Sequence, residues 1–232
     1  MSVIRKLVIF GDSISTPLIG DGGYEALLCR LLQPNELYNF AVPQSGASSV
    51  TPDHVMHILN LQSDACAGAD VVILWHGTND WYWGAPVGKC GSRDGTTYIG
   101  AMELAIDRIR RYAPEALVIT ATPLYRHQAP DGSQISGDAW FIPNKAGATL
   151  ADYDRALREV ARAYSVPLVE MRVLTGFCEQ NSERFLPDNV HPGKEGCDMI
   201  ARIFAGQIEG LMSYRKGMEN HENVSDAREG RR

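Results

Sequence analysis

Three residues that lie far apart in the sequence have the chemistry that acyl transfer requires. Ser13 follows an apolar run at residues 7–10, while Asp188 and His191 lie much later in the chain. A serine hydroxyl is a weak nucleophile that needs an adjacent base, and an imidazole can be that base. The imidazole needs an acid to fix its tautomer and stabilise its charged form, and Asp188 is close enough to reach His191 across a single turn. We therefore predict a catalytic set of Ser13, His191 and Asp188, although Ser13 taken alone could equally cap a helix.

Acyl transfer also needs hydrogen-bond donors aimed at the oxyanion of the tetrahedral intermediate. The backbone N–H groups of Ser13 and Gly46 and the side-chain amide of Asn79 are the candidates, and they follow three successive strand-like runs. Gly46 is attractive because a residue without a side chain lets substrate approach the backbone closely. We predict that these three groups form an oxyanion hole.

The elements that must position these residues alternate between strand-like and helix-like segments. Apolar runs predict strands at residues 7–10, 37–41, 71–75, 116–122 and 167–171. Apolar residues at helical spacing predict helices over residues 24–32, 52–65, 98–112, 150–164 and 195–211. Such alternation indicates an α/β fold with a parallel sheet and right-handed crossovers, and so a three-layer sandwich with helices on both faces. Open parallel sheets bind ligands at the carboxyl ends of their strands, where Ser13 and Asn79 are expected.

Four sequence blocks resemble the signature blocks of the SGNH (GDSL-type) hydrolases. They are Gly11-Asp12-Ser13-Ile14-Ser15, the isolated Gly46, Gly77-Thr78-Asn79-Asp80 and Asp188-Asn189-Val190-His191-Pro192. The resemblance covers residues 7 to about 211, with isoleucine at position 14 where the family name has leucine. It implies a flavodoxin-like sheet of five parallel strands in the order 2-1-3-4-5. It also implies Ser13 as nucleophile, His191 as base, Asp188 as its partner, and Gly46 and Asn79 in the oxyanion hole.

Composition limits the remaining function classes. The chain has 232 residues, of which 44% are hydrophobic, and a net charge of -6. Nucleic-acid binding normally needs a basic patch, so we expect no nucleic-acid partner. Without a run of about 18 apolar residues we expect no membrane span. The five cysteines are dispersed and none has Cys-x-x-Cys spacing, so we expect a reducing compartment and neither a disulfide framework nor a zinc cluster.

The ends of the chain carry two further expectations. Residues 1–6 lead into the first strand without an apolar stretch and cleavage site, so we expect no secretory signal and a cytoplasmic protein. We expect a single hydrolase domain over residues 1–212. Residues 213–232 have few apolar side chains and mixed charge, which predicts a flexible tail.

Two long connections are rich in aromatic residues and leave the carboxyl ends of predicted strands. The first contains Trp81, Tyr82 and Trp83, and the second contains Tyr125 and His127. Long loops in compact domains are often functional, so these residues are candidates for substrate binding. Aromatic rings can stack on the faces of sugars or line an acyl pocket, but they can equally pack on each other to close the loop.

Other polar residues have simpler structural explanations. Asp12 is expected to accept hydrogen bonds from nearby backbone amides, and Asp80 to cap a helix or loop. His54 and His57 share one face of a predicted helix, but two histidines without a third ligand are a weak metal signal. We therefore expect neither a metal nor a cofactor.

These features predict a serine esterase that hydrolyses small acyl esters, preferably acetyl esters on a carbohydrate, through an acyl-enzyme intermediate. A lipolytic esterase or thioesterase for longer acyl chains would use the same catalytic set and is the alternative. A non-catalytic carbohydrate-binding module would keep the aromatic residues but would have no need for Ser13, His191 and Asp188 together. Composition leaves the oligomeric state open.

Overall fold

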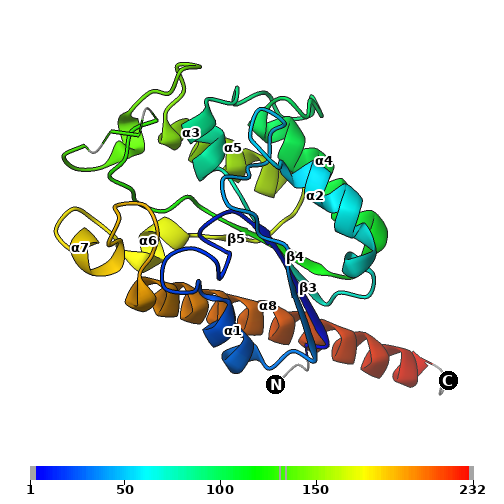
Figure 1. The fold of residues 1–232 in the computed structure, drawn as a ribbon. Helices are drawn as coiled ribbons and strands as arrows, with labels where there is room; N and C mark the ends of the chain where they lie inside the picture. Colours follow the sequence, from blue (N-terminus) through cyan, green and yellow to red (C-terminus); the bar gives the residue numbers. More distant parts are fainter. Residues whose placement is uncertain (1–3, 131, 134, 230–232) are drawn as a thin grey trace.

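The computed structural model describes residues 4–130, 132–133 and 135–229, with residues 216–229 described as backbone only. The strands are β1 (Lys6–Gly11), β2 (Glu36–Asn39), β3 (Val71–Trp75), β4 (Leu117–Ala121) and β5 (Leu168–Val169). The longer helices are α1 (Glu25–Leu32), α2 (Val55–Gln62), α4 (Tyr98–Tyr112), α5 (Leu150–Ala163) and α8 (Lys194–Glu229). The shorter ones are η1 (Ser63–Cys66), α3 (Thr78–Trp83), η2 (Ala139–Phe141), α6 (Met171–Thr175) and α7 (Ser182–Phe185). Figure 1 shows their arrangement.

The five strands form one parallel sheet in the order β2-β1-β3-β4-β5, which confirms the predicted fold class. In the register of the central pair, Leu7 lies beside Val71 and Gly11 beside Trp75. Strands β1 and β3 therefore end side by side, and the turns that carry Ser13 and Asn79 begin at the same edge of the sheet.

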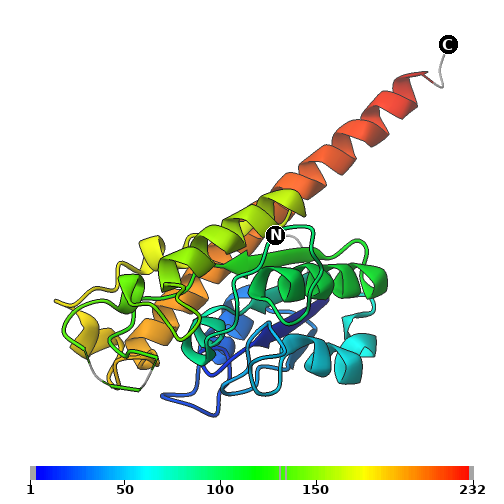
Figure 2. The same ribbon diagram turned by 90° about the horizontal axis from the view of Figure 1, so that it is seen from above.

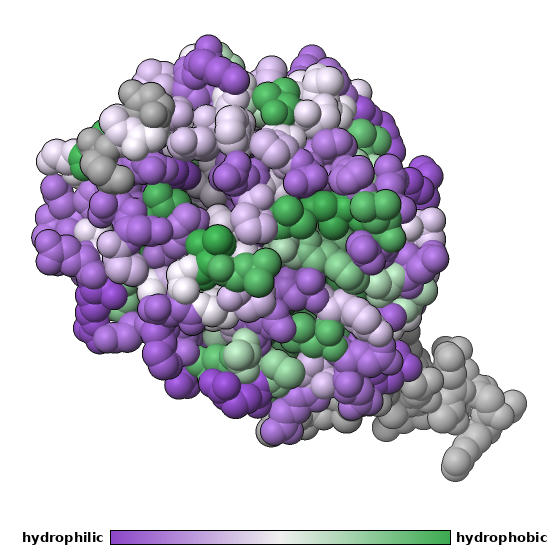
Figure 3. All heavy atoms as spheres, in the orientation of Figure 1, coloured by the Kyte–Doolittle hydropathy of each residue, from purple (hydrophilic) through white to green (hydrophobic). Residues whose placement is uncertain are grey.

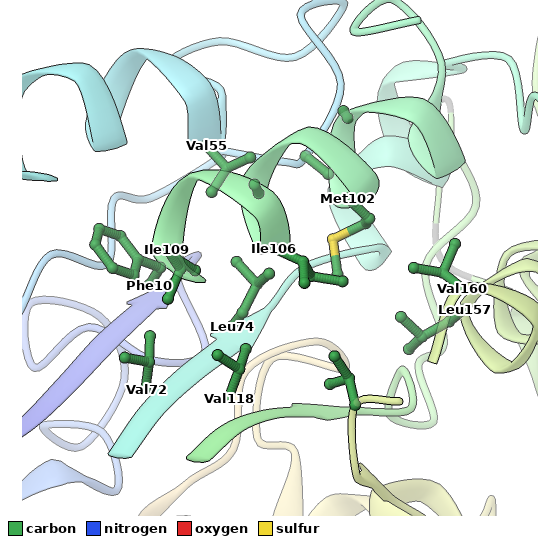
Figure 4. Packing of buried hydrophobic residues seen from close by; sticks show 14 of the residues in the cluster. Phe10, Val55, Val72, Leu74, Met102, Ile106, Ile109, Val118, Leu157 and Val160 are labelled. Carbon is green, nitrogen blue, oxygen red and sulfur yellow. The ribbon is translucent and has the colours of Figure 1, made fainter. Parts of the chain in front are cut away.

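Each central strand sends alternate side chains into two separate cores, because successive side chains of a strand point to opposite faces. Val8, Phe10, Val72 and Leu74 pack under α2, α4 and α5. Figure 4 shows this layer, in which Ile106 and Ile109 of α4 lie over the sheet. The intervening residues of β1 and β3 pack against α1 and α8 on the other face. Burial on both faces explains why these strands are continuously apolar.

Local capping residues fix the start of two of the three helices on the first face, α4 and α5. Thr97 accepts a hydrogen bond from the Gly100 N–H at the start of α4. Thr149 and Asp152 form a capping box at the start of α5. Caps of this kind satisfy N–H groups that a helix leaves unpaired in its first turn.

The last helix is longer than the sequence pattern predicted. We expected it over residues 195–211, but α8 runs over Lys194–Glu229, and its C-terminal part projects from the α/β body in Figure 2. The segment after residue 211 contains no proline, so no residue there is incompatible with a helical backbone. Flexibility of residues 213–232 stays a prediction, and residues 230–232 lie outside the described part.

The exposed face in Figure 3 is mostly hydrophilic, and its hydrophobic residues form separate groups. Single exposed apolar side chains are ordinary on protein surfaces. Among the helices that the structure describes, none combines the length and the apolar character that crossing a bilayer would take.

Candidate active site

A tight turn after β1 carries Ser13. The Asp12 side chain accepts a hydrogen bond from the Ile14 N–H (2.9 Å), and its backbone oxygen accepts one from the Ser15 N–H (3.0 Å). Gly11 packs so closely on Ser15 that a Cβ at position 11 would lie 2.4 Å from the Ser15 hydroxyl oxygen. The turn therefore has one well-defined shape, and Ser13 is half-buried at its tip. The Asp12 contacts match the structural role expected for that residue.

A second turn carries Asp188 and His191. One oxygen of Asp188 accepts hydrogen bonds from the N–H groups of Val190 (3.0 Å) and His191 (2.6 Å). Asn189 adopts a left-handed backbone conformation (φ 70°) and donates its N–H to Leu186 O (2.8 Å). Partial burial alone would raise the pKa of Asp188, but the hydrogen bonds from His191 and Val190 hold that pKa below its usual value. The carboxyl is thus kept charged beside the imidazole.

The two turns meet at the imidazole of His191. Its Nδ1 lies 2.6 Å from the second oxygen of Asp188, and its Nε2 lies 2.9 Å from Ser13 Oγ. The ring is half-buried, so one edge remains accessible to a substrate. Three residues that sequence reasoning brought together on chemical grounds are therefore within hydrogen-bond distance in the order that nucleophilic catalysis needs.

A cavity of about 240 Å³ opens beside this chain of contacts. Most of the residues that line it have polar side chains, and the lining consists of Ser13, Gln44, Thr78, Asn79, Tyr82, Trp83, Arg126, Gln128, Val190 and His191. Tyr82 and Trp83 were predicted to contact substrate, and their position at the cavity fits that role.

Three other candidates for substrate contact lie away from the cavity. Trp81 is fully buried and donates its indole N–H to Ile142 O (3.0 Å). Tyr125 and His127 are also buried, and the Tyr125 hydroxyl lies 3.0 Å from His127 Nε2. These residues close their loops by packing, which corrects the prediction that they bind substrate.

His127 instead supports the turn that carries His191 through its backbone. Its N–H donates to Asn189 O (2.9 Å), and its ring nitrogen Nε2 lies 2.8 Å from Ser182 Oγ on α7. The loop after β4 is thus attached both to the turn that holds His191 and to α7. This second contact between a serine and a histidine is buried.

The structure corrects the assignment of Gly46 to the oxyanion hole. The Gly46 N–H is already donated to Thr51 Oγ1 (2.9 Å), and Gly46 does not line the cavity. A Cβ at this position would lie 2.6 Å from Thr51 Cγ2 and 2.7 Å from an Asp80 oxygen. Glycine is required here by close packing on Thr51 and Asp80, and not by the approach of a substrate.

Gln44 presents the kind of backbone donor that Gly46 does not. It lines the cavity, is exposed, and has φ 66°, an uncommon conformation for a residue with a side chain. Among the residues that the structure describes, neither the Gln44 N–H nor the Ser13 N–H has a hydrogen-bond partner. The Asn79 side-chain amide donates one of its hydrogens to Ser45 O (2.9 Å) and keeps a second.

The carboxyl groups next to Ser13 and Asn79 in the sequence, those of Asp12 and Asp80, are both buried. Asp80 accepts hydrogen bonds from the N–H groups of Ala47 (2.9 Å) and Ser48 (2.8 Å), so it caps that loop as expected. Burial raises the pKa of Asp80 to about 6. Burial likewise raises the pKa of Asp12 to about 7. Both residues organise backbone, and neither lines the cavity.

Arg126 is a cavity residue that sequence reasoning did not select. Its side chain is buried and lies beside Thr78 and Gln128 at the wall of the cavity. A single arginine inside a long loop carries no recognisable motif. The only available signal was its position soon after the carboxyl end of a predicted strand, the edge where ligands bind.

No group of three or more His, Cys, Asp or Glu side chains with the geometry of a metal site occurs among the described residues. His54 and His57 lie near each other on and beside α2, with ring centroids 6.2 Å apart.

Comparisons with known proteins agree with this geometry. The chain matches the GDSL-like lipase/acylhydrolase family over residues 9–199, which is well over half of its length. A search of curated protein sequences gave no match. Among similar solved structures, one is 26% identical, with a TM-score of 0.79, covering 91% of this chain and 99% of the other.

Two further structures share the fold at lower identity. A possible lipase from Chitinophaga pinensis is 23% identical, with a TM-score of 0.66, and 89% of this chain and 98% of that chain are covered. The acetyl xylan esterase AlAXEase is 19% identical, with a TM-score of 0.58, and 88% of this chain and 99% of that chain are covered.

Proposed function

The chain belongs to the GDSL-like lipase/acylhydrolase family of ester hydrolases, and from this premise we propose that it hydrolyses small acyl esters with Ser13, His191 and Asp188. The observation that carries the proposal is the chain of contacts from Asp188 through both ring nitrogens of His191 to Ser13 Oγ. Because Asp188 contacts Nδ1, the other nitrogen is free to accept the serine proton.

In the first half of the proposed reaction, Ser13 Oγ attacks the ester carbonyl carbon and transfers its proton to His191 Nε2. The carbonyl oxygen becomes an oxyanion, and Asp188 stabilises the imidazolium. His191 then donates the proton to the departing alcohol oxygen as the ester C–O bond breaks. In the second half, water attacks the acyl-Ser13 carbonyl, again with His191 as base, and the acid leaves with Ser13 restored.

We assign the oxyanion hole to the backbone N–H groups of Ser13 and Gln44 and the Asn79 side-chain amide. All three residues line the cavity. The two backbone groups have no other acceptor in the described part of the chain. Donors that are fixed before the reaction stabilise the developing charge without reorganisation, which is the largest single contribution in many enzymes.

A small acyl group is favoured by the size of the cavity. Its volume of about 240 Å³ is below the range of about 300–1,000 Å³ typical of pockets for drug-sized ligands. Tyr82 and Trp83 at its wall offer ring faces for a sugar. The fold likeness to an acetyl xylan esterase is compatible with acetyl transfer from a carbohydrate, the finer part of this proposal.

Hydrolysis of p-nitrophenyl esters from acetyl to palmitoyl tests the proposal, with the Ser13→Ala protein as the blank. We expect the highest kcat/KM for the acetyl ester and a steep decrease with chain length. A long-chain optimum would instead support a lipolytic enzyme. A parallel screen of acetylated oligosaccharides against simple acetyl esters tests the carbohydrate part, which fails if simple esters are preferred.

A further inference from the structure

The guanidinium of Arg126 is buried and bonded only to neutral partners. One terminal nitrogen donates to Thr78 Oγ1 (2.9 Å) and the other donates to Gln128 Oε1 (2.7 Å). The charged group also lies over the rings of Trp81 and Tyr82, at 5.2 and 5.4 Å from their centroids. These contacts hold the guanidinium in one place, but none of them supplies a negative charge.

The hydrogen-bonding capacity of this side chain is only partly used. A guanidinium has five N–H donors in a planar fork. Two are accounted for by Thr78 and Gln128, and the Arg126 Nε is buried without a partner in the described part of the molecule. Buried charges are costly unless they are paired and hydrogen-bonded, so an arginine left in this state is unusual.

The nearest carboxylates do not pair with Arg126. No ion pair within 4.0 Å joins it to any carboxylate among the described residues. Burial lowers the pKa of Arg126, and the charges of Asp12 and Asp188 oppose that change from a distance, without a direct contact. The Asp12 carboxyl is hydrogen-bonded to the Ile14 N–H, and the Asp188 carboxyl to His191. Burial also raises the pKa of Asp12 to about 7, so its negative charge is incomplete at neutral pH.

Arg126 shares its cavity with the catalytic residues. Ser13, His191 and Arg126 all line the same space of about 240 Å³, and so do the polar side chains of Gln44, Thr78 and Gln128. A cavity of this size holds only a compact molecule, so any ligand that fills it would reach both the Ser13 hydroxyl and the guanidinium. An anionic group on the ligand would supply the charge that the protein does not.

We propose that Arg126 binds a carboxylate of the substrate, so that the preferred ester is a small molecule that carries a free carboxylate beside the ester bond. This inference rests on the proposed function and narrows its substrate class. A carboxylate matches the fork of a guanidinium, to which it can bind through two parallel hydrogen bonds. The side-chain amide of Gln128 lines the same cavity and can donate a further hydrogen bond to its oxygens.

Two pairs of esters test the proposal. In each pair an alkyl ester replaces the free carboxylate, and only hydrolysis of the ester bond that both members share is counted, with half weight for the two equivalent bonds of diethyl succinate. Ethyl hydrogen succinate and diethyl succinate place the charge on the acyl part. O-acetyl-lactate and its methyl ester place it on the alcohol part. In at least one pair we expect the wild-type protein to have a kcat/KM about 10- to 100-fold higher for the charged ester, because hydrogen bonds to charged groups contribute on that scale.

The variants Arg126→Gln and Arg126→Lys locate the preference. We expect the charged-to-neutral ratio of kcat/KM to fall to about one or below in Arg126→Gln, and to an intermediate value in Arg126→Lys, because lysine keeps the charge but loses the fork. This ratio does not depend on how much of the variant is folded, since both esters are measured on one preparation. Arg184→Gln is the matched control: it removes a cation from the exposed pair with Glu195 and should leave the ratio unchanged.

The outcomes separate this inference from the proposed function. Equal rates for charged and neutral esters in both pairs, with hydrolysis that Ser13→Ala abolishes, would overturn the carboxylate site and leave the esterase intact. If no ester is turned over above the Ser13→Ala blank, the proposed esterase function is contradicted. Calorimetric titration with succinate then decides whether Arg126 binds a carboxylate. Binding to the wild type that is lost in Arg126→Gln would support a carboxylate site, and no binding to the wild type would overturn it.

Discussion

Two serine–histidine pairs of nearly equal geometry occur in this molecule. His191 Nε2 lies 2.9 Å from Ser13 Oγ, and His127 Nε2 lies 2.8 Å from Ser182 Oγ. By distance alone the second pair would be the better candidate for a nucleophile and its base. Everything around the two pairs differs, and the differences identify what a catalytic pair requires.

The first difference is the group that contacts the imidazole besides the serine. In the Ser13 pair the imidazole has Asp188 on Nδ1, 2.6 Å away, which leaves Nε2 for the serine. In the Ser182 pair the same Nε2 that faces Ser182 also faces the Tyr125 hydroxyl at 3.0 Å. Ser182 in turn donates its hydroxyl proton to Glu179 O (3.0 Å). That hydroxyl is therefore committed to the backbone and is not poised for attack.

The second difference is access. Ser13 and His191 line the cavity, whereas Ser182 and His127 are both buried away from it. An ester cannot reach the second pair without opening the contact between the loop after β4 and α7. Short distance is thus necessary for a nucleophile–base pair, but an acid on the far nitrogen and an open approach decide its function.

The largest expected effect is the loss of the Ser13 hydroxyl. In Ser13→Ala we expect kcat/KM for the best ester to fall about 10⁴- to 10⁶-fold, because triad members act as a unit and removal of one leaves only binding and the oxyanion hole. Ester kinetics measure the loss, and an unchanged thermal midpoint shows that the fold is kept. Activity that persists in this variant would remove the distinction between the two pairs.

Asp188→Asn sharpens the same comparison, since it makes the Ser13 pair resemble the Ser182 pair, which has no carboxylate partner among the contacts of the described residues. We expect kcat to fall about 10³- to 10⁴-fold, because an amide no longer fixes the productive tautomer or stabilises the imidazolium. Steady-state kinetics on the same ester provide the measurement. A loss of less than tenfold would show that Asp188 is not the partner of the base.

Asn79→Ala removes a donor that lines the cavity beside the Ser13 pair. We expect kcat to fall about 10²- to 10³-fold with little change in KM, which is the usual effect of deleting one oxyanion-hole donor. Gln44→Ala is the matched control, because it deletes a side chain at the same cavity but keeps the backbone N–H. Equal losses in the two variants would contradict the assignment of the hole.

The meeting of Ser13, His191 and Asp188 was predictable from sequence because it depends on residue type and on where strands end. The strand at residues 71–75 was predicted with the observed bounds, and β1 extends the predicted run 7–10 by one residue at each end. Continuous burial on both faces makes such strands apolar throughout, and the resemblance to the GDSL-type blocks supplied their order. The matched family then confirms the class of enzyme.

The wall of the cavity was not predictable, because it depends on backbone conformations that residue types do not reveal. Residues 81–83 were interpreted as loop, but Thr78–Trp83 is the helix α3, and the helical turn directs Trp81 into the core while Tyr82 and Trp83 face the cavity. Gln44 adopts a positive φ that its side chain gives no reason to expect. The sequence favours Gly46 instead, because a residue without a side chain lets substrate approach the backbone closely.

A stability measurement tests a feature of the turn that carries Ser13. The turn of Ser13 rests on the buried carboxyl of Asp12, whose pKa is raised to about 7, mainly by burial and further by Asp80, while the Ile14 N–H and Arg126 oppose the rise. The folded state then holds this proton more tightly than the unfolded chain. Its contribution to stability is therefore present at pH 4 and is lost as the pH rises to about 7.

Asp12→Asn replaces the titrating carboxyl with a neutral amide that keeps an oxygen for the Ile14 N–H. We therefore expect the pH-dependent loss of stability to disappear in this variant. The variant should gain stability relative to the wild type as the pH rises from 5 to 8, by at most about 3 kcal/mol, because about two of the three pKa units of the shift fall in that interval, at 1.36 kcal/mol each. Urea unfolding of both proteins at the two pH values provides the difference. A difference that does not change with pH would show that the Asp12 carboxyl titrates normally.

The smallest expected effect comes from the second pair itself. Ser182→Ala deletes the contact with His127 and the hydrogen bond to Glu179 O, and we expect a loss of about 2 kcal/mol in the free energy of unfolding, from two hydrogen bonds at about 1 kcal/mol each. Activity should stay at the wild-type value, because the support of the catalytic turn by the His127 N–H is a backbone contact that this change leaves in place. If kcat fell while the fold stayed intact, the buried pair would be part of the catalytic machinery, and proximity would count for more than access and an acid partner.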